Sequence, residues 1–325
     1  MFQVHHVPFP LLFKATSGHF QTIIGSFGLS PQLPPSKNLI VNLSDGDSLS
    51  GITTTPQNWN RKKPTIIMIH GLGGSEDSLY LRRLVPKILE LEYRVIRLSL
   101  RGCGSGTLLA KKTYHGGASD DLLEAIKVIK HETPESPLVL IGFSLGGNIS
   151  LKLLGEMKYE AKKYIHHAIT VCPATDLHEI AQRLEAKQNI FYKRYYLNVL
   201  VSQIKKRKEL FPDHPEITYR KEMTFIDFDN EYTSKVWNFE NALDYYDQCS
   251  SKKYIPDIKV ACEVLFSKDD PIIDAGTILE AKWPKQVRLL SSQGGGHMGF
   301  LKYVDTAYGF RWMDHQIVNL IKNIF

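Results

Sequence analysis

The hydrophobic pattern of the chain alternates between short continuous apolar runs and longer stretches that mix apolar and polar residues. An unbroken apolar run such as 65–69 is typical of a strand that is covered on both faces of a sheet. We predict strands at 65–69, 94–100, 137–141, 164–171, 258–266 and 286–290, and helices at 77–91, 119–131, 145–157, 272–283 and 305–324. This alternation predicts an α/β fold with a mostly parallel sheet and helices on both faces.

The beginning of the chain departs from this alternation. Residues 1–36 carry five prolines and are predicted to be irregular. The strand-like runs 37–43 and 48–54 follow and flank the turn Ser44-Asp45-Gly46-Asp47. They predict an antiparallel hairpin at one edge of the sheet.

A long interruption separates two of the predicted strands. Residues 173–256 are rich in Tyr, Lys and Arg and lack the apolar strand runs found elsewhere. We interpret this segment as a helical cap inserted into the sheet domain. The predicted division is therefore a first core part with an N-terminal extension (1–172), a cap (173–256) and a second core part (257–325).

Composition limits the classes of protein that the chain can belong to. Its 325 residues are 43% hydrophobic and 23% charged, which is typical of a globular protein and excludes disordered, collagenous and coiled-coil classes. No apolar run approaches the roughly 20 residues of a membrane-spanning helix. The four cysteines lie far apart without zinc-ligand spacing and no signal peptide is recognisable, so we expect reduced thiols and a cytoplasmic location.

The net charge of +6 is concentrated in the predicted cap. Residues 182–222 contain ten Lys and Arg against five Asp and Glu, a net charge of +5. A charge of this size does not indicate nucleic-acid binding. The four consecutive basic residues at 205–208 have two interpretations, a solvated helix face or a contact with anionic lipid headgroups.

The strongest chemical signal is Gly142-Phe143-Ser144-Leu145-Gly146, which joins the predicted strand 137–141 to the predicted helix 145–157. In this strand–turn–helix context, GxSxG is typical of a nucleophile elbow. The turn exposes the serine hydroxyl at the carboxyl edge of the sheet, where the N–H groups that begin the helix favour a developing anion. We therefore predict Ser144 as a nucleophile.

A serine nucleophile needs a base and a group that orients the base, in the chain order Ser, Asp or Glu, His. His297 lies in a glycine-rich segment after the last predicted strand and is the predicted base. Asp270 follows the strand 258–266 and precedes Pro271, and it is the predicted orienting carboxylate. Asp269 is the alternative, and we prefer Asp270 because it stands directly before the next predicted helix.

An acyl-transfer enzyme also needs two N–H donors for the oxyanion. The N–H of Leu145, which follows the nucleophile, is the first candidate. The second is the N–H of Leu72 in His70-Gly71-Leu72-Gly73-Gly74, which ends the strand 65–69. This loop is not followed by Gly-Lys-Ser/Thr, so it does not predict a nucleotide-binding P-loop.

Two further patterns have a structural and a functional interpretation. His115 and Asp120 match an H-x-x-x-x-D spacing that some acyltransferases use, but we favour Ser119 or Asp120 as the N-cap of the helix 119–131. The aromatic residues Phe191, Tyr192, Tyr195 and Tyr196 repeat at helical spacing. They predict a helix that packs on the core, a lid over an acyl pocket, or both.

Taken together, these motifs resemble those of the YheT-like α/β-hydrolases, a group that includes abhydrolase-domain serine esterases and lipases, and the similarity extends over nearly the whole chain. The matching segments are Ser17–Ile23, His70–Gly74, Arg101–Cys103, Tyr114–Gly117, the elbow around Ser144, Tyr192–Leu197, Asp244–Tyr246, Asp269–Pro271 and Gly295–Phe300. The resemblance implies the α/β-hydrolase fold, with Ser144, Asp270 and His297 as the catalytic triad.

The resemblance also implies an activity, the hydrolysis of short-chain acyl or acylglycerol-type esters through an acyl-enzyme. The expected partner is a small-molecule or lipid ester, with peripheral membrane contact through the basic cap and no nucleic acid. No metal or organic cofactor is expected. Two alternatives remain open, an acyltransferase with the same triad and a binding protein that keeps the fold without catalysis.

Overall fold

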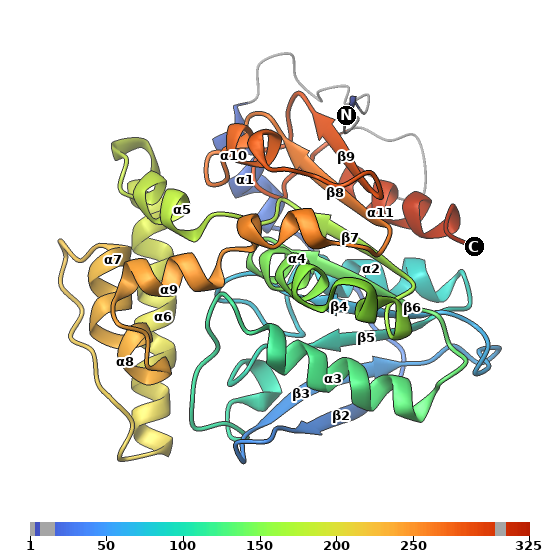
Figure 1. Cartoon of the computed structure of the whole chain (residues 1–325), viewed down its shortest axis with the longest axis horizontal. Coiled ribbons are helices and arrows are strands. Elements are labelled where there is room, and N and C mark those ends of the chain that lie inside the picture. Colours follow the sequence, from blue (N-terminus) through green and yellow to red (C-terminus); the bar gives the residue numbers. More distant parts are fainter. Residues whose placement is uncertain (1–3, 7–16, 303–309) are drawn as a thin grey trace.

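The computed structural model describes residues 4–6, 17–302 and 310–325. Within these residues the chain forms a nine-stranded sheet in the order β1-β9-β8-β7-β6-β4-β5-β3-β2 (Figure 1). The strands are β1 (Val4–His6), β2 (Lys37–Asn42), β3 (Ser48–Thr54), β4 (Thr65–Ile69), β5 (Arg94–Leu98), β6 (Leu138–Phe143), β7 (His167–Val171), β8 (Cys262–Ser267) and β9 (Val287–Ser292).

The sheet is mostly parallel, as the alternating pattern predicts. All pairings from β1 through β9, β8, β7, β6 and β4 to β5 are parallel. The exceptions are β3, which pairs antiparallel with β5, and β2, which pairs antiparallel with β3. The predicted hairpin at one edge of the sheet is therefore confirmed.

Helices cover both faces of the sheet. One face packs against α2 (Leu79–Leu89) and α11 (Trp312–Lys322), and the other against α3 (Ser119–Glu132), α4 (Leu145–Met157) and α10 (Ala275–Glu280). Successive residues of β4 point to opposite faces, since Ile66 and Met68 belong to the first apolar layer and Ile67 and Ile69 to the second. Burial on both faces explains why these strands lack polar alternation.

The inserted segment, residues 173–256, leaves the sheet after β7 and returns before β8. It contains α5 (Leu177–Leu184), α6 (Ile190–Leu210), α7 (Phe225–Phe228), α8 (Ser234–Trp237) and α9 (Ala242–Cys249) and no strand among its residues, all of which are described. Figure 1 shows these helices gathered at one end of the sheet. The predicted helical character of 173–256 is confirmed.

The prediction that residues 1–36 are irregular is wrong for the described part of that range. Residues Val4–His6 form β1, which pairs with β9, and Gly18–Ser26 form the helix α1. The Ser17 hydroxyl caps α1 by accepting a hydrogen bond from the Phe20 N–H. The prolines in the described part of this region lie after α1, where they do not interrupt it.

Other predicted boundaries move by a few residues. The strand expected from 258 begins at Cys262, because Ile255–Asp257 form a 3₁₀ turn. The helix expected at 272–283 is shorter, Ala275–Glu280. The helix expected at 305–324 is observed as Trp312–Lys322, and residues 303–309 lie outside the described part.

All four cysteines are free and buried. In the described residues, no helix has the length and apolar character needed to cross a bilayer.

Candidate active site

Ser144 lies on a strained turn between β6 and α4. Its backbone has φ 50° and ψ −114°, a conformation that L-residues rarely adopt. The glycines on either side leave no room for a side chain. A Cβ at Gly142 would lie 2.5 Å from the Gly146 carbonyl oxygen, and a Cβ at Gly146 would lie 2.5 Å from that of His70. The close approach of strand and helix therefore requires the two glycines of the elbow.

His297 is hydrogen-bonded on both sides of its ring. Its Nε2 lies 3.0 Å from Ser144 Oγ, and its Nδ1 lies 2.9 Å from Asp270 Oδ2. The ring and the Asp270 carboxyl group are buried. The structure thus brings together the three residues that the chain order Ser-Asp-His predicts, although 153 positions separate Ser144 from His297.

Asp270 is fixed by backbone groups as well as by the histidine. Its Oδ1 accepts hydrogen bonds from the N–H groups of Ile272 at 2.8 Å and Ile273 at 2.9 Å. Asp269, the alternative considered from the sequence, instead accepts a hydrogen bond from the Gly296 N–H at 2.8 Å. The structure therefore places Asp270, not Asp269, beside the histidine ring.

The histidine loop rests on α1, which sequence reasoning did not connect to the site. The His297 N–H donates to Thr22 Oγ1 at 2.8 Å, and Thr22 Oγ1 donates to the Gly18 carbonyl at 2.7 Å. Gly18 packs so closely on the Asp269 carbonyl that a Cβ there would lie 1.7 Å away. Helix α1 therefore supports both loops that carry the candidate base and carboxylate.

A buried thiol completes the surroundings of this pair. Cys172, Asp270 and His297 each offer a possible ligand atom, and these atoms lie within 4.8 Å of one another. Among the described residues, no other group of three His, Cys, Asp or Glu side chains is close enough to hold a metal ion. Burial and the nearby Asp270 carboxylate raise the pKa of the Cys172 thiol well above its ordinary value, so the thiol stays protonated at neutral pH. A protonated thiol is a poor metal ligand.

The loop after β4 faces Ser144 with one free N–H group. The Gly71 N–H donates to the Tyr80 hydroxyl at 2.9 Å, and the Gly73 N–H donates to the Tyr114 hydroxyl at 2.8 Å. The Gly74 N–H donates to the Gly71 carbonyl at 3.1 Å. Of the four N–H groups at 71–74, all in the described part of the chain, that of Leu72 is left without an acceptor.

The second candidate donor lies across from this loop. Leu145 begins α4, and the N–H groups of a helix's first turn have no acceptor within the helix. Gly71 packs against the elbow, because a Cβ there would lie 3.1 Å from Ser144 Cβ. The two predicted donors, Leu72 and Leu145, thus border the serine from two elements.

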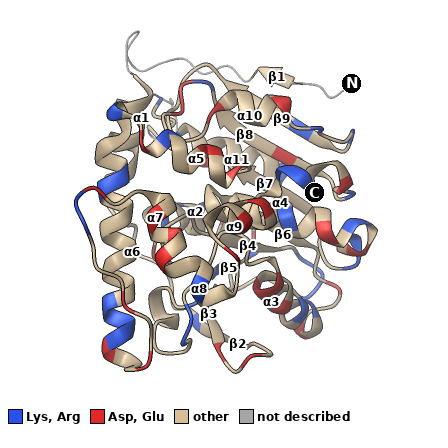
Figure 2. Cartoon of the chain, turned by 60° about the vertical axis from the view of Figure 1, so that its left-hand side comes forward, with Lys and Arg blue, Asp and Glu red and all other residues tan. Residues whose placement is uncertain are grey.

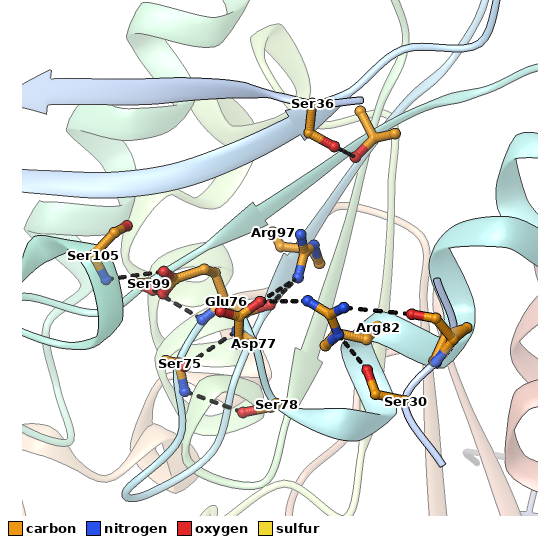
Figure 3. Close-up of polar contacts among 12 residues, drawn as sticks. Ser30, Ser36, Ser75, Glu76, Asp77, Ser78, Arg82, Arg97, Ser99 and Ser105 are labelled. Atoms are coloured by element: carbon orange, nitrogen blue, oxygen red, sulfur yellow. Dashed lines mark hydrogen bonds and ion pairs between the residues drawn. The ribbon is translucent and has the colours of Figure 1, made fainter. Parts of the chain in front are cut away.

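A buried glutamate holds the far end of this loop in place. The Glu76 carboxylate accepts hydrogen bonds from the Ser105 N–H at 2.9 Å and from the Ser99 hydroxyl, which in turn accepts from the Glu76 N–H (Figure 3). Arg97 donates to the Glu76 carbonyl at 2.6 Å. No sequence signal identifies Glu76, because its partners come from distant segments.

A cavity opens at Ser144 and runs between the sheet and the inserted segment. Most of its walls are apolar, including Leu177, Ile180, Leu184, Leu200, Ile204, Phe225, Phe228, Ile272 and Ile273. Tyr196 of α6 also lines it. The aromatic group predicted in this helix is therefore divided: Tyr196 faces the cavity, Tyr192 is half-buried, and Phe191 and Tyr195 are exposed.

The cavity wall also carries a carboxyl group that sequence reasoning missed. Asp229 begins a π-helical turn, Asp229–Thr233, and its carboxylate accepts hydrogen bonds from the hydroxyls of Thr233 and Tyr246, each at 2.6 Å. Burial raises the pKa of Asp229 to about 6. The residues around Asp229 show no periodic apolar pattern, so the sequence did not identify this carboxyl group.

The H-x-x-x-x-D pattern does not form an acid–base pair. The His115 ring packs against that of Trp237 at a tilt of 53°, with ring centroids 4.5 Å apart, and its Nδ1 accepts a hydrogen bond from the Gly117 N–H. Burial, with the positive charge of Lys152 and other nearby cations, lowers the pKa of His115 to about 3. Ala118 is the N-cap of α3, so the prediction of Ser119 or Asp120 as the cap is wrong.

The basic run at 205–208 is not a uniform solvated face. Arg207 is buried and donates to the carbonyls of Gly102, Thr107 and Ala110. These bonds attach the end of α6 to the loop 101–112, while Lys205 and Lys206 remain exposed. The solvated-face interpretation is therefore wrong for Arg207.

Comparisons with known proteins agree with this arrangement. A family profile described as "alpha/beta hydrolase fold" matches residues 64–302. The Escherichia coli protein "Putative esterase YheT" is 26% identical over 265 residues, which cover 80% of this chain and 77% of the relative. A Saccharomyces cerevisiae "Monoacylglycerol lipase" is 27% identical over 82% of this chain and 60% of its own length. Human "Phospholipase ABHD3" is 26% identical over 88% of this chain and 71% of its own length.

Solved structures share the fold at lower sequence identity. The esterase Pf2001 of Pyrococcus furiosus superposes with a TM-score of 0.58 at 17% identity, covering 100% of this chain and 98% of that one. Est1E from Butyrivibrio proteoclasticus gives a TM-score of 0.58 at 12% identity over 88% of this chain and 98% of its own. At these identities the likeness concerns the fold alone.

Proposed function

The chain belongs to the alpha/beta hydrolase fold family, and we propose that it is a serine carboxylesterase that hydrolyses short-chain acyl or acylglycerol-type esters. One observation carries the proposal, the hydrogen-bonded series Ser144–His297–Asp270 at the opening of a largely apolar cavity. A hydroxyl, an imidazole and a carboxylate in this order form the arrangement that activates serine as a nucleophile.

In the proposed reaction Ser144 Oγ attacks the ester carbonyl carbon while His297 Nε2 takes its proton. Asp270 accepts a hydrogen bond from His297 Nδ1–H, which holds the ring in the required tautomer and stabilises the imidazolium. The N–H groups of Leu72 and Leu145 hold the oxyanion. Loss of one such donor typically lowers turnover by about 100- to 1,000-fold.

The tetrahedral intermediate collapses when its bond to the alcohol oxygen breaks. His297 gives its proton to the leaving alkoxide, and the acyl group remains on Ser144. Water then attacks the acyl-enzyme as His297 takes one of its protons, and the carboxylic acid and free serine form. Protein side chains, backbone N–H groups and water supply every group that these steps require.

The substrate class rests on the cavity and on the named relatives. A cavity with apolar walls favours the acyl chain of a lipid ester over a charged acyl group. Relatives named as an esterase, a monoacylglycerol lipase and a phospholipase support ester or lipid substrates for this chain as well. We further propose that the inserted segment acts as a cap, because its helices supply much of the cavity wall.

Active-site labelling tests the proposal. A fluorophosphonate probe should label the wild-type protein and fail to label Ser144→Ala, and the same variant should lose hydrolysis of p-nitrophenyl acyl esters. Ser202→Ala, which changes an exposed serine of α6, is the matched control and should behave like wild type. A wild-type protein that takes no label and hydrolyses no ester from acetyl to palmitoyl would overturn the proposal. Product analysis with an added alcohol separates hydrolysis from acyl transfer.

A further inference from the structure

Helix α1 buries its small and polar residues rather than its apolar ones. Its buried residues are Gly18, Gln21 and Gly25. A Cβ at Gly25 would lie 2.4 Å from Gly299 Cα, so the helix backbone lies directly against the histidine loop. At Gly18 and Gly25 the inward face therefore leaves no space for a larger side chain.

The opposite face of α1 and the residue that follows it are apolar and exposed. Phe20, Ile23, Ile24 and Phe27 repeat at i, i+3, i+4 and i+7, and their exposed fractions are 45%, 47%, 42% and 64%. A helix at a protein–water boundary normally shows the reverse arrangement. In addition, positions 15 to 36 of the sequence contain no Asp, Glu, Lys or Arg. Such a face is typical of an interaction surface and unusual for one that meets only water.

The first turns of α6 extend this apolar surface. His19 Nδ1 lies 3.1 Å from the Tyr192 hydroxyl, and the two rings are stacked with centroids 5.6 Å apart. Phe191 and Tyr195, on either side of Tyr192, are 77% and 63% exposed. We call the exposed residues Phe20, Ile23, Ile24, Phe27, Phe191 and Tyr195 the α1–α6 face.

The α1–α6 face adjoins the candidate active site. Tyr196, which follows Tyr195 in α6, lines the cavity that opens at Ser144. From the other helix, Thr22 accepts the hydrogen bond of the His297 N–H. An apolar molecule that reaches this face is therefore next to the wall of the acyl cavity.

Basic residues accompany the face. Lys187 and Arg194 lie at the same end of α6, are exposed, and form no ion pair with any other described residue. Figure 2 shows basic residues in the first turns of α6 and again in its last turns, with α1 beside the first turns. Exposed cations next to an apolar stripe complement a surface that has negative headgroups above an apolar interior.

We propose that the α1–α6 face docks on the surface of a lipid bilayer that contains anionic lipids. The apolar side chains enter the boundary between headgroups and acyl chains, and Lys187 and Arg194 contact the headgroups. This docking site differs from the contact expected from the sequence, because the run 205–208 lies at the opposite end of α6. The docking is independent of catalysis, and with the proposed esterase activity it gives a lipid ester a short path to Ser144.

Vesicle flotation tests the docking. Wild-type protein should float with equimolar phosphatidylcholine–phosphatidylserine vesicles and less with phosphatidylcholine vesicles. The double variant Ile23→Ser, Phe27→Ser should partition about 100-fold more weakly, at roughly tenfold for each apolar side chain removed from the lipid. Arg194→Gln should weaken binding to the anionic vesicles by about fivefold. Leu108→Ser removes a 68% exposed leucine from the loop at the other end of α6 and is the matched control.

Several outcomes would overturn the docking proposal. Wild-type protein that does not float would overturn it, and so would a double variant that floats like wild type. A third such outcome is a loss of vesicle binding in the double variant that is no larger than the loss in Leu108→Ser. A wild-type dimer that becomes monomeric in the double variant, measured by light scattering, would assign the face to a second copy of this chain instead.

The same variants separate docking from catalysis. The double variant should keep its thermal unfolding midpoint and its turnover of a water-soluble short-chain ester, because both side chains are exposed. Ser144→Ala should float like wild type. Loss of esterase activity in all forms would therefore refute the proposed function and leave the flotation result standing.

Discussion

Replacing Asp229 by Asn should stabilise the protein above about pH 6 and change its stability little near pH 4. The Asp229 carboxyl is buried in the cavity wall, and its two hydrogen-bond donors are the neutral hydroxyls of Thr233 and Tyr246. In the described part of the chain, no cation contributes to the altered pKa of Asp229. A charged carboxylate at this position is therefore penalised by desolvation without a compensating ion pair.

The magnitude follows from the two pKa values. The ordinary pKa of this carboxyl is 3.8, and burial in the folded protein raises it to about 6. Below pH 3.8 the group is neutral in both states, and its contribution to stability is fully present. Between the two values unfolding releases a proton, so the unfolding free energy falls as pH rises and levels off above about pH 6. The total loss is about 3 kcal/mol.

Asparagine keeps the shape of the neutral carboxyl group and cannot ionise. The unfolding free energy of Asp229→Asn minus that of wild type should thus rise by about 3 kcal/mol between about pH 4 and about pH 7. Urea unfolding followed by tryptophan fluorescence at a series of pH values measures this difference. A difference that stays constant across this range would refute the reasoning.

Glu179 provides a matched comparison with a different midpoint. Burial raises the pKa of Glu179 to about 7. The unfolding free energy of Glu179→Gln minus that of wild type should therefore rise at a higher pH than the same difference for Asp229→Asn. Its size should be smaller, because the Glu179 side chain is 29% exposed and solvent screens its charge.

Three further substitutions, one of them with a matched control, test other parts of the structure. Gly146→Ala should destabilise the fold by about 3 kcal/mol in urea unfolding, because the new Cβ would meet backbone carbonyls that cannot move aside. Arg207→Met should lower the unfolding free energy by about 3 kcal/mol as well, because three loop carbonyls lose their hydrogen-bond donor. Lys206→Met, at an exposed position, is the control and should lower it by less than about 0.5 kcal/mol. Thr22→Val should lower the kcat of a soluble ester about tenfold by releasing the His297 backbone, and an unchanged kcat would contradict that role.

The strands were predictable because their local pattern and their tertiary environment agree. All five residues of β4 are buried, and the sequence shows four of these positions, 66–69, as one apolar run after Thr65. The boundaries of α10 were not predictable from the pattern. The Asp270 carboxylate takes the N–H groups of Ile272 and Ile273, so the helix begins only after Asp274, whose side chain caps it. Because Ile272 and Ile273 are apolar, the sequence pattern placed them in the helix, although their N–H groups bond to the Asp270 carboxylate instead.

The candidate site was predictable where its geometry follows from chain order. GxSxG specifies a local turn, and the positions of Asp270 and His297 after successive strands place them at the same sheet edge as Ser144. Glu76 and Asp229 left no comparable signal. Ser99 and Ser105, which bond to Glu76, and Tyr246, which bonds to Asp229, lie in other segments that reach these residues only in the folded chain. A single charged residue also shows no periodic pattern in the sequence.

Helix α1 escaped prediction because five prolines flank its apolar repeat in the sequence, and in the structure this hydrophobic stripe faces outward. Gly18 and Gly25 must face inward, since the backbone there touches the loops that carry Asp269 and Gly299. The apolar residues of the same helix are thereby forced to the outside, where water alone is an unfavourable neighbour. The close packing of Gly18 and Gly25 thus accounts for both faces of α1. Substitutions can separate the roles of the two faces. Thr22→Val should reduce turnover of a soluble ester without changing flotation, and Ile23→Ser with Phe27→Ser should do the opposite. If either variant changed both readouts equally, the two faces of α1 would not act independently.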